Sequence, residues 1–260
     1  MTIMLQAKRA MASLLTHRMV GGVIAAATGN RIPAFGLRID SSNPLVSPEI
    51  KAKLFFGIYE SAERRFVARY LPGDADVVEL GASLGVLTSI IRRRVSQPRR
   101  IVAVEANPLL APILRRTLEV NGCDANVFVE VAAIHYGPEE EVSFSVGRHS
   151  TDGRVRHAAD GGVSVIRTPT VTLSRILRRH QVRDFSLIAD IEGAEWGVIE
   201  HDLEAAAAAK IIIIELHTSS VGEDAEILLG RLLATGRFDL VDRYGNSCVL
   251  RPRSTKGRAA

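Results

Sequence analysis

The spacing of hydrophobic residues changes near residue 76, and this change divides the chain into two regions. In the first region, apolar positions such as Leu54, Ile58 and Phe66 recur at the spacing of a helix. In the second region, short apolar runs alternate with helical stretches. We expect residues 1–75 to form a helical cap that shapes the substrate site, with a short helix at 7–16, a strand at 34–39 and a long helix from Pro48 to about Tyr70.

Strand and helix alternate along the second region. Strands are predicted at 77–80, 100–105, 126–134, 186–191 and 211–216, and helices at 84–95, 108–121, 173–180, 194–210 and 225–234. An antiparallel pair at 141–146 and 163–172 is expected around a loop at 147–162, and a hairpin at 238–244 and 248–251 closes the chain. This order predicts an α/β domain over residues 76–252, with a mostly parallel sheet, an antiparallel C-terminal hairpin and helices on both faces.

The net charge of +4 comes from the C-terminal tail and not from the body of the protein. The chain has 33 Lys and Arg against 29 Asp and Glu. The tail contains Arg251, Arg253, Lys256 and Arg258 and no acidic residue, so it accounts for the whole excess. We therefore expect no nucleic-acid partner, and the aromatic content of 5% is too low to suggest a base-stacking surface. Residues 253–260 are predicted to be disordered.

Cysteine content and hydropathy predict a cytoplasmic protein without a membrane span. Cys123 and Cys248 cannot form a disulfide framework, and they lack the spacing of a zinc site. The longest early apolar run, Met19 to Gly29, is about half of the ~20 residues that a spanning helix needs. It is similar to a signal peptide only loosely, because His17 and Arg18 interrupt the apolar stretch.

A glycine-rich turn follows the first strand of the second region and opens the next helix. Its sequence is Val77-Val78-Glu79-Leu80-Gly81-Ala82-Ser83-Leu84-Gly85. Glycine lets a ligand approach the backbone, and the N-terminus of a helix presents free N–H groups. In an open α/β sheet, ligands bind beyond the C-terminal ends of the strands, which is where this turn lies. Three kinds of site are compatible with the turn.

Two of these interpretations fit incompletely. A dinucleotide site requires G-x-G-x-x-G, and the middle glycine is missing. A hydrolase elbow requires G-x-S-x-G, which the turn satisfies with Ser83 as nucleophile, and Asp190 and His217 follow in the chain order of a serine esterase. However, no HGGG-type oxyanion loop precedes the turn, and an elbow does not account for Glu79.

The third interpretation is a site for S-adenosylmethionine, a nucleoside with a cationic sulfonium and an amino-acid tail. The donor has no phosphate, so a further glycine is unnecessary, and an acid at the end of the second strand, Glu105, can accept bonds from both ribose hydroxyls. Glu79 can face the ammonium group of the donor, and small alanines near the end of the third strand leave room for adenine. The predicted donor-binding residues are Glu79, Gly81, Ala82, Ser83, Gly85, Glu105, Ala106, Asn107, Ala132, Ala133 and Asp190.

Five motifs strengthen this interpretation because they occur in the order of a known family. They are Tyr59-Glu60-Ser61-Ala62-Glu63, Gly81-Ala82-Ser83-Leu84-Gly85, Glu105-Ala106-Asn107-Pro108, Asp190-Ile191-Glu192-Gly193-Ala194-Glu195 and Glu215-Leu216-His217. In these motifs the chain resembles the FkbM-type methyltransferases. The resemblance implies a class I methyltransferase fold, Rossmann-like with a seven-stranded sheet, and S-adenosylmethionine as donor. It also implies O-methylation of a sugar, glycan or natural-product hydroxyl.

The chain departs from the family pattern at two positions. Many members have Lys two residues before the Asp of the Asp-x-Glu-Gly block, where this chain has Ile188. Many also have Asp where this chain has Glu79. The first departure leaves the role of that Lys unfilled, and with it the identity of the acceptor, whereas the second keeps the negative charge.

Three side chains are candidates for catalysis on the acceptor hydroxyl. Asp190 ends the fourth parallel strand, Glu192 follows it on the same face, and His217 lies at the next strand end. Methyl transfer is an in-line displacement that depends on positioning, and a base near the methyl group helps to remove the hydroxyl proton. The same three residues could hold a divalent cation, but nothing in their spacing requires one, so the prediction is a site without metal.

Several interpretations stay open at this point. The Tyr59-Glu60 pair could fold over the donor or lie on a helix surface, and Glu195 is expected to be an acid in the first turn of a helix. A serine esterase using Ser83 and a non-catalytic module that binds S-adenosylmethionine are the alternatives to an O-methyltransferase.

Overall fold

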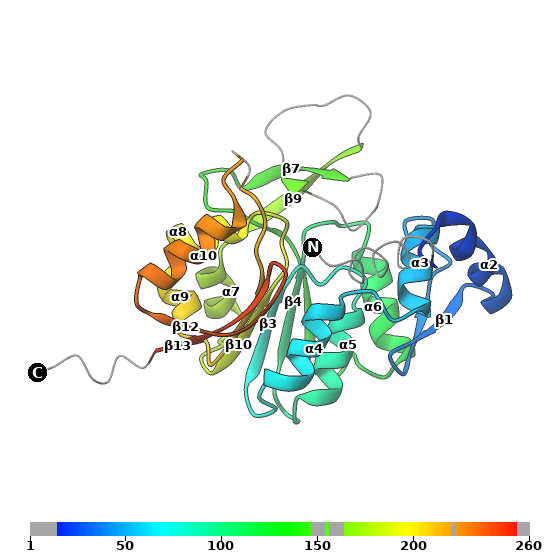
Figure 1. Ribbon diagram of the computed structural model, residues 1–260, viewed down its shortest axis with the longest axis horizontal. Helices are drawn as coiled ribbons and strands as arrows, with labels where there is room; N and C mark the ends of the chain where they lie inside the picture. The colour runs from blue at the N-terminus through cyan, green and yellow to red at the C-terminus, as the bar shows by residue number, and fades with distance from the viewer. Residues whose placement is uncertain (1–14, 147–153, 156–163, 220–221, 254–260) are drawn as a thin grey trace, which may run out of the picture.

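The computed structural model describes residues 15–146, 154–155, 164–219 and 222–253 (Figure 1). The strands of its main sheet are β3 (Asp76–Leu80), β4 (Ile101–Glu105), β5 (Val127–Val131), β10 (Phe185–Ala189), β11 (Ile212–Glu215), β12 (Phe238–Tyr244) and β13 (Ser247–Pro252). They form a seven-stranded sheet in the order β12-β13-β11-β10-β3-β4-β5. The strands from β11 to β5 are parallel, and β13 is antiparallel to both of its neighbours, β11 and β12. The predicted fold class is confirmed.

Two layers of helices cover the main sheet (Figure 1). One layer contains α4 (Ser61–Tyr70), α5 (Val86–Arg94) and α6 (Ala111–Val120), and the other contains α7 (Leu173–Arg179), α8 (Glu195–His201), α9 (Leu203–Ala207) and α10 (Ala225–Ala234). Because both faces are covered, β3, β4 and β10 are buried at every position. Val78 and Leu80 pack with the second layer, whereas Val77 packs with α4 and α5. Side chains alternate along a strand, so Glu79 faces the same layer as Val77.

A smaller sheet lies at the end of the molecule where the parallel strands finish (Figure 1). It contains β6 (Ala133–Ile134), β7 (Glu141–Val146), β8 (Arg154–Val155) and β9 (Ser164–Val171), in the order β6-β9-β7-β8. The predicted antiparallel pair is confirmed by the register of β7 and β9. The predicted strand at 126–134 is wrong in its length, because β5 ends at Val131 and β6 leaves the main sheet to pair with β9.

The N-terminal region contains α2 (Arg18–Thr28), a hairpin of β1 (Arg31–Ala34) and β2 (Leu37–Asp40), and α3 (Pro48–Phe55). The single strand predicted at 34–39 is therefore wrong. The chain reverses at Phe35 and Gly36, whose φ values of +55° and +74° suit a two-residue hairpin turn. Buried residues of this region pack against Leu84 and Val86 at the start of α5 and against Leu110 and Ile113 near the start of α6.

Two predicted long helices are each divided in the structure. The helix predicted from Pro48 to Tyr70 is broken between α3 and α4, because Gly57 and Glu60 have φ values of +71° and +46°. A left-handed residue cannot continue a right-handed helix. The helix predicted at 194–210 is broken at Asp202, whose Oδ2 accepts hydrogen bonds from Ser174 N at 2.8 Å and Tyr136 OH at 3.0 Å. Both breaks accompany tertiary contacts, since they bring polar side chains next to other elements.

Some predicted features lie wholly or largely outside the described residues. These are the helix at 7–16 up to residue 14, the loop at 147–162 except β8, and the tail beyond Arg253. Within the described part of the chain, no helix has the length and hydropathy needed to cross a bilayer.

Candidate functional site

The glycine turn connects β3 to α5 in a conformation that few side chains tolerate. Gly81 and Gly85 have φ values of +90° and +75°, and Ser83 between them has a φ of +47°. A Cβ atom on Gly81 would lie 1.9 Å from the carbonyl oxygen of Asp190. Both the backbone angle and the close approach of β10 therefore require glycine at position 81.

Glu105, at the end of β4, joins the glycine turn to the next turn along the sheet. Its Oε2 accepts a hydrogen bond from Ser83 N and its Oε1 accepts one from Asn107 N, both at 2.7 Å. Burial raises the pKa of Glu105, and these backbone N–H groups oppose the shift. Each carboxylate oxygen keeps a lone pair that can accept a ligand hydroxyl. Nδ2 of Asn107 is shut off from solvent and lacks a hydrogen-bond partner among the described residues, so it is available to a ligand.

Glu79 is buried in the middle of the sheet, with 1% of its surface exposed. Neither carboxylate oxygen has a hydrogen-bond partner among the described residues. In the sheet register Glu79 lies between Ala103 on β4 and Ile188 on β10, and neither neighbour is polar. Burial raises the pKa of Glu79 to about 8, because the charged form loses its hydration.

The break between α3 and α4 brings Tyr59 and Glu60 to the glycine turn. Tyr59 is buried, and its hydroxyl lies 3.0 Å from Oγ of Ser83. Burial and the charge of Glu79 raise the pKa of Glu60 well above its ordinary value. The pair therefore lies beside the predicted donor site and not on a helix surface.

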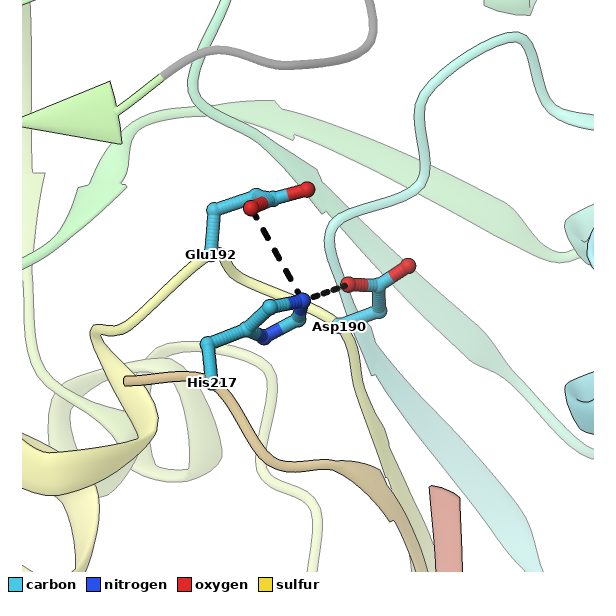
Figure 2. Close-up of side chains that lie close together, drawn as sticks. All are labelled: Asp190, Glu192 and His217. Atoms are coloured by element: carbon cyan, nitrogen blue, oxygen red, sulfur yellow. Dashed lines mark ion pairs between the residues drawn. The ribbon is translucent and has the colours of Figure 1, made fainter. Parts of the chain in front are cut away.

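Asp190, Glu192 and His217 meet where β10 and β11 end, on the other side of Gly81. Figure 2 shows the two carboxylates pointing toward Nε2 of His217. Nε2 lies 3.8 Å from Oδ1 of Asp190 and 3.7 Å from Oε2 of Glu192. The three predicted catalytic side chains are therefore brought together, and one potential ligand atom from each lies within 4.8 Å of the others.

Glu195 contacts both the backbone near Glu192 and the ring of His217. It is fully buried, and its two oxygens accept hydrogen bonds from the backbone N–H groups of Ile191 and Gly193, both at 2.8 Å. Its Oε1 also lies 3.1 Å from Nδ1 of His217. A carboxylate only accepts, so Nδ1 of His217 is the donor and Nε2 faces Asp190 and Glu192. Glu195 does begin α8, as expected, but its carboxylate holds the site together.

Like charges dominate the electrostatics of the cluster. Burial lowers the pKa of His217, but the hydrogen bond to Glu195 and the nearby carboxylates outweigh it and raise this pKa to about 9. Burial and the charge of Glu215 raise the pKa of Asp190 well above its ordinary value. Burial and the charge of Glu63 raise the pKa of Glu215 to about 7. The imidazole is therefore the positive member of a group with excess negative charge.

A cavity of about 410 Å³ opens beside Asp190, between α4 and the turn of the β12–β13 hairpin. Its lining includes Tyr59, Glu60, Glu63, Asp190, Glu215 and Asn246. The volume is within the range of small-molecule sites. Four of the lining residues, Glu60, Glu63, Asp190 and Glu215, are acidic and one, Lys53, is basic, so the lining favours a ligand with a cationic end.

The serine-esterase interpretation is not supported by this geometry. A triad requires a hydrogen bond between the serine hydroxyl and Nε2 of the histidine. Here Oγ of Ser83 lies against the Tyr59 hydroxyl, and Nε2 of His217 faces two carboxylates. Among the described residues, no contact joins Ser83 to His217.

One protein family matches the part of the chain that contains this site. The sequence pattern of the methyltransferase FkbM domain matches residues 79–243, which include the glycine turn and the His217 cluster. The chain belongs to the FkbM methyltransferase family. It is accordingly a methyltransferase, with S-adenosylmethionine as its methyl donor.

Several solved structures are similar to parts of this chain at low sequence identity. A protein of the NADB-Rossmann superfamily from Streptococcus agalactiae is 13% identical with a TM-score of 0.44, over 74% of this chain and 68% of that one. A methyltransferase from Geobacter sulfurreducens is 17% identical with a TM-score of 0.42, over 74% and 76%. The N-terminal domain of EvdMO1, solved with SAH bound, is 14% identical with a TM-score of 0.43, over 74% and 80%. No curated protein matches the chain.

The structure places the predicted donor-binding residues of this FkbM-family protein around one turn. Glu79, the residues from Gly81 to Gly85 and those from Glu105 to Asn107 lie together, and Asp190 contacts Gly81 through its carbonyl group. Ala132 and Ala133 are buried where β5 leads into β6, and Ala132 N donates to Glu105 O at 3.1 Å.

The sequence-based candidates omitted four acids that the structure brings to the site. Glu195 was visible in the sequence only as a helix acid, although it ends the Asp-x-Glu-Gly-Ala-Glu motif. Glu60, Glu63 and Glu215 line the cavity, and Glu63 accepts a hydrogen bond from Ser247 Oγ at 2.7 Å. Their place in the Tyr-Glu-x-x-Glu and Glu-x-His motifs was the available signal.

The unusual residue Ile188 lies directly beside Glu79 in the sheet register. A Lys at this position would enter the same layer as Glu79 and would provide it with a cation. Ile188 is instead 2% exposed and packs in the apolar cluster under α4 and α5. Ile188 therefore provides no charge partner to the buried Glu79, whose carboxylate oxygens have no hydrogen-bond partner among the described residues.

Proposed function

We propose that this FkbM-family protein transfers the methyl group of S-adenosylmethionine to a hydroxyl oxygen of a sugar, a glycan or a natural product. The observation that carries the proposal is the meeting of Asp190, Glu192 and His217 beside Gly81. Groups that can orient a hydroxyl and accept its proton lie next to the turn at which the donor is expected. The two buried free cysteines accord with the expected cytoplasmic location.

In this proposal the donor spans the glycine turn. Glu105 accepts hydrogen bonds from the ribose, Asn107 and the backbone around Ala132 and Ala133 surround adenine, and the acid-lined cavity receives the cationic amino-acid end. Glu79 lies below this end, where a ligand ammonium would stabilise its charged form. The N-terminal residues 1–75 act as a cap, since Tyr59 reaches Ser83 from that region.

The acceptor hydroxyl loses its proton to Asp190. Asp190 lines the cavity beside the glycine turn, and a positioned carboxylate can accept this proton. The acceptor oxygen attacks the methyl carbon, the carbon–sulfur bond breaks, and its electron pair goes to sulfur. The products are a methyl ether and S-adenosylhomocysteine.

The test is methyl transfer by the purified full chain from isotopically labelled S-adenosylmethionine. The acceptors are a panel of hydroxylated glycans and natural products together with matched amines and thiols. We expect label in a methyl ether and a loss of about 10²-fold or more in Asp190→Asn. Glu204→Gln is the matched control, because Glu204 is an exposed acid paired with Arg237.

Two outcomes would contradict the proposal. Label on nitrogen or sulfur alone would replace O-methylation with another transfer. Binding of S-adenosylhomocysteine in calorimetry without transfer to any acceptor would favour a non-catalytic binding module. Gly81→Arg serves as the donor-binding control, with circular dichroism to show whether it folds; equal donor binding by this variant would contradict the proposed donor position.

A further inference from the structure

We propose that Asp190, Glu192 and His217 form the binding site of one divalent cation. The ligands are two carboxylates and one imidazole. This departs from the metal-free site expected from the sequence. The cation's effect on the acceptor rests on the proposed function, but the binding site itself does not.

Two of the separations between the three side chains match a coordination sphere. Bonds of about 2.1 Å to a small divalent ion place neighbouring ligand atoms roughly 3.0–4.2 Å apart, depending on the angle between them. Nε2 of His217 lies 3.8 Å from Oδ1 of Asp190 and 3.7 Å from Oε2 of Glu192. A hydrogen bond would have brought these atoms closer together. These two separations therefore suit ligand atoms around an ion better than hydrogen-bonded atoms, and one potential ligand atom from each side chain lies within 4.8 Å of the others.

One carboxylate oxygen of the cluster is buried without a hydrogen-bond donor among the described residues. Oδ1 of Asp190 is shut off from solvent and accepts no hydrogen bond from the described residues. Figure 2 shows this oxygen directed at Nε2 of His217, while the other carboxylate oxygen points away. A buried carboxylate oxygen that lacks a donor is costly, and a cation at the centre of the cluster would satisfy it.

Glu195 supplies the outer contact that metal-binding histidines require. A histidine ligand almost always donates its second ring N–H to a carboxylate or carbonyl, which fixes the ring and its tautomer. Nδ1 of His217 lies 3.1 Å from Oε1 of fully buried Glu195, and Trp196 Nε1 donates to the His217 carbonyl at 2.9 Å. Glu195 in turn accepts two backbone N–H groups from the segment that carries Glu192. The imidazole and the second carboxylate are therefore positioned by one buried residue.

The charge of the surroundings also favours a dication. Three carboxylates, those of Asp190, Glu192 and Glu195, lie within 3.8 Å of His217, and Glu215 adds to the negative potential at Asp190. Mixed carboxylate and imidazole ligands suit Mn²⁺ and Zn²⁺ better than Ca²⁺. The remaining coordination positions would hold the acceptor oxygen, whose proton the ion makes easier to remove.

The experiment measures Mn²⁺ binding to the full chain by the loss of the free-ion electron paramagnetic resonance signal, with no donor or acceptor present. We expect one site per chain. Glu192→Gln and His217→Gln should weaken Mn²⁺ binding at least tenfold, and Glu195→Gln by about 10–100-fold. Glu192 is partly exposed, so its variant is expected to fold, and circular dichroism checks each protein.

Glu130→Gln is the matched control, because Glu130 lies 2.9 Å from His180 in a separate carboxylate–histidine pair. Mn²⁺ affinity that is unchanged in Glu192→Gln, or lost equally in Glu130→Gln, would overturn the site. No binding by wild type at millimolar Mn²⁺ would overturn it as well. Displacement of Mn²⁺ by Zn²⁺ or Mg²⁺ would support it and identify the preferred ion.

Methyl transfer separates this inference from the proposed function. Mn²⁺ binding without transfer to any hydroxyl would support the cation site and overturn O-methylation. Transfer that continues in a chelator, from a chain that binds no Mn²⁺, would overturn the cation site and support O-methylation.

Discussion

Two acidic regions flank Gly81, and they bury carboxylates in different ways. On the donor side, Glu105 is held by two backbone N–H groups, while Glu79 has apolar neighbours on the adjacent strands and neither of its carboxylate oxygens has a hydrogen-bond partner among the described residues. On the other side, three carboxylates surround His217. The first arrangement favours a neutral acid that a cationic ligand can ionise. The second holds several carboxyl groups around one imidazole. Adjacent strand ends can therefore prepare one site for a cationic donor and another for proton transfer.

Disturbing the close approach of the two regions at Gly81 should have the largest effect. Gly81→Ala places a Cβ atom 1.9 Å from the Asp190 carbonyl oxygen at a φ of +90°. We expect the free energy of unfolding to fall by at least about 4 kcal/mol, measured by urea denaturation. Gly122→Ala is the control, because Gly122 has a φ of +60° and nothing within 4 Å, so only about 1 kcal/mol should be lost. Equal losses would show that the close approach of Gly81 to the Asp190 carbonyl group is unimportant for stability.

The charged region should depend on Glu195 for both folding and activity. Glu195→Gln puts an NH₂ group where a carboxylate oxygen now accepts a hydrogen bond. We expect a loss of about 2–4 kcal/mol in the free energy of unfolding and about 10² in kcat. Denaturation and steady-state kinetics measure the two effects. A change in KM alone would argue against the positioning of His217 by Glu195.

A cation introduced beside Glu79 should give this carboxylate a charged partner, as the carboxylates near His217 have. Ile188→Lys enters the apolar layer next to Glu79. We expect it to destabilise the protein less than the same change in a Glu79→Gln background, by about 1–3 kcal/mol in a double-mutant cycle. Urea denaturation of the four proteins gives the coupling. A coupling near zero would show that position 188 does not contact Glu79.

The stability of the donor side should depend on pH through Glu79. Its pKa rises from 4.5 to about 8 on folding, so between these values the folded state holds a proton that the unfolded state has lost. The free energy of unfolding therefore falls as pH rises from about 5 to about 8. Glu79→Gln should remove this contribution. The melting temperature of the variant minus that of wild type should therefore increase as pH rises across this range. Parallel curves for the two proteins would contradict the raised pKa.

The smallest effect is expected where a neutral pair joins the cap to the turn. Tyr59→Phe removes the contact at 3.0 Å between the tyrosine hydroxyl and Oγ of Ser83. We expect a loss of about 1 kcal/mol, because both groups are uncharged. Ser83→Ala should cost a similar amount, and the double variant should cost little more than either. Independent losses in denaturation would show that the two hydroxyls do not interact.

The amino-acid sequence by itself determined the fold class and most of the named site residues. Strand and helix periods of the second region arise from side-chain burial, which local spacing records. The glycine turn, Glu105, Asp190 and His217 were predictable because each lies at the end of a recognisable strand. The order of strands in the chain then implies that these ends lie along one edge of the sheet.

Only the tertiary structure decided how the polar groups meet. The breaks at Glu60 and Asp202 depend on left-handed backbone and on hydrogen bonds to distant elements, which helical periodicity does not record. The roles of Glu195 and Glu79 depend on burial and on neighbours across the sheet, among them His217 and Ile188. The charge state of a carboxylate follows from these three-dimensional neighbours, so the same residue type gives a neutral acid in one place and a positioning carboxylate in another.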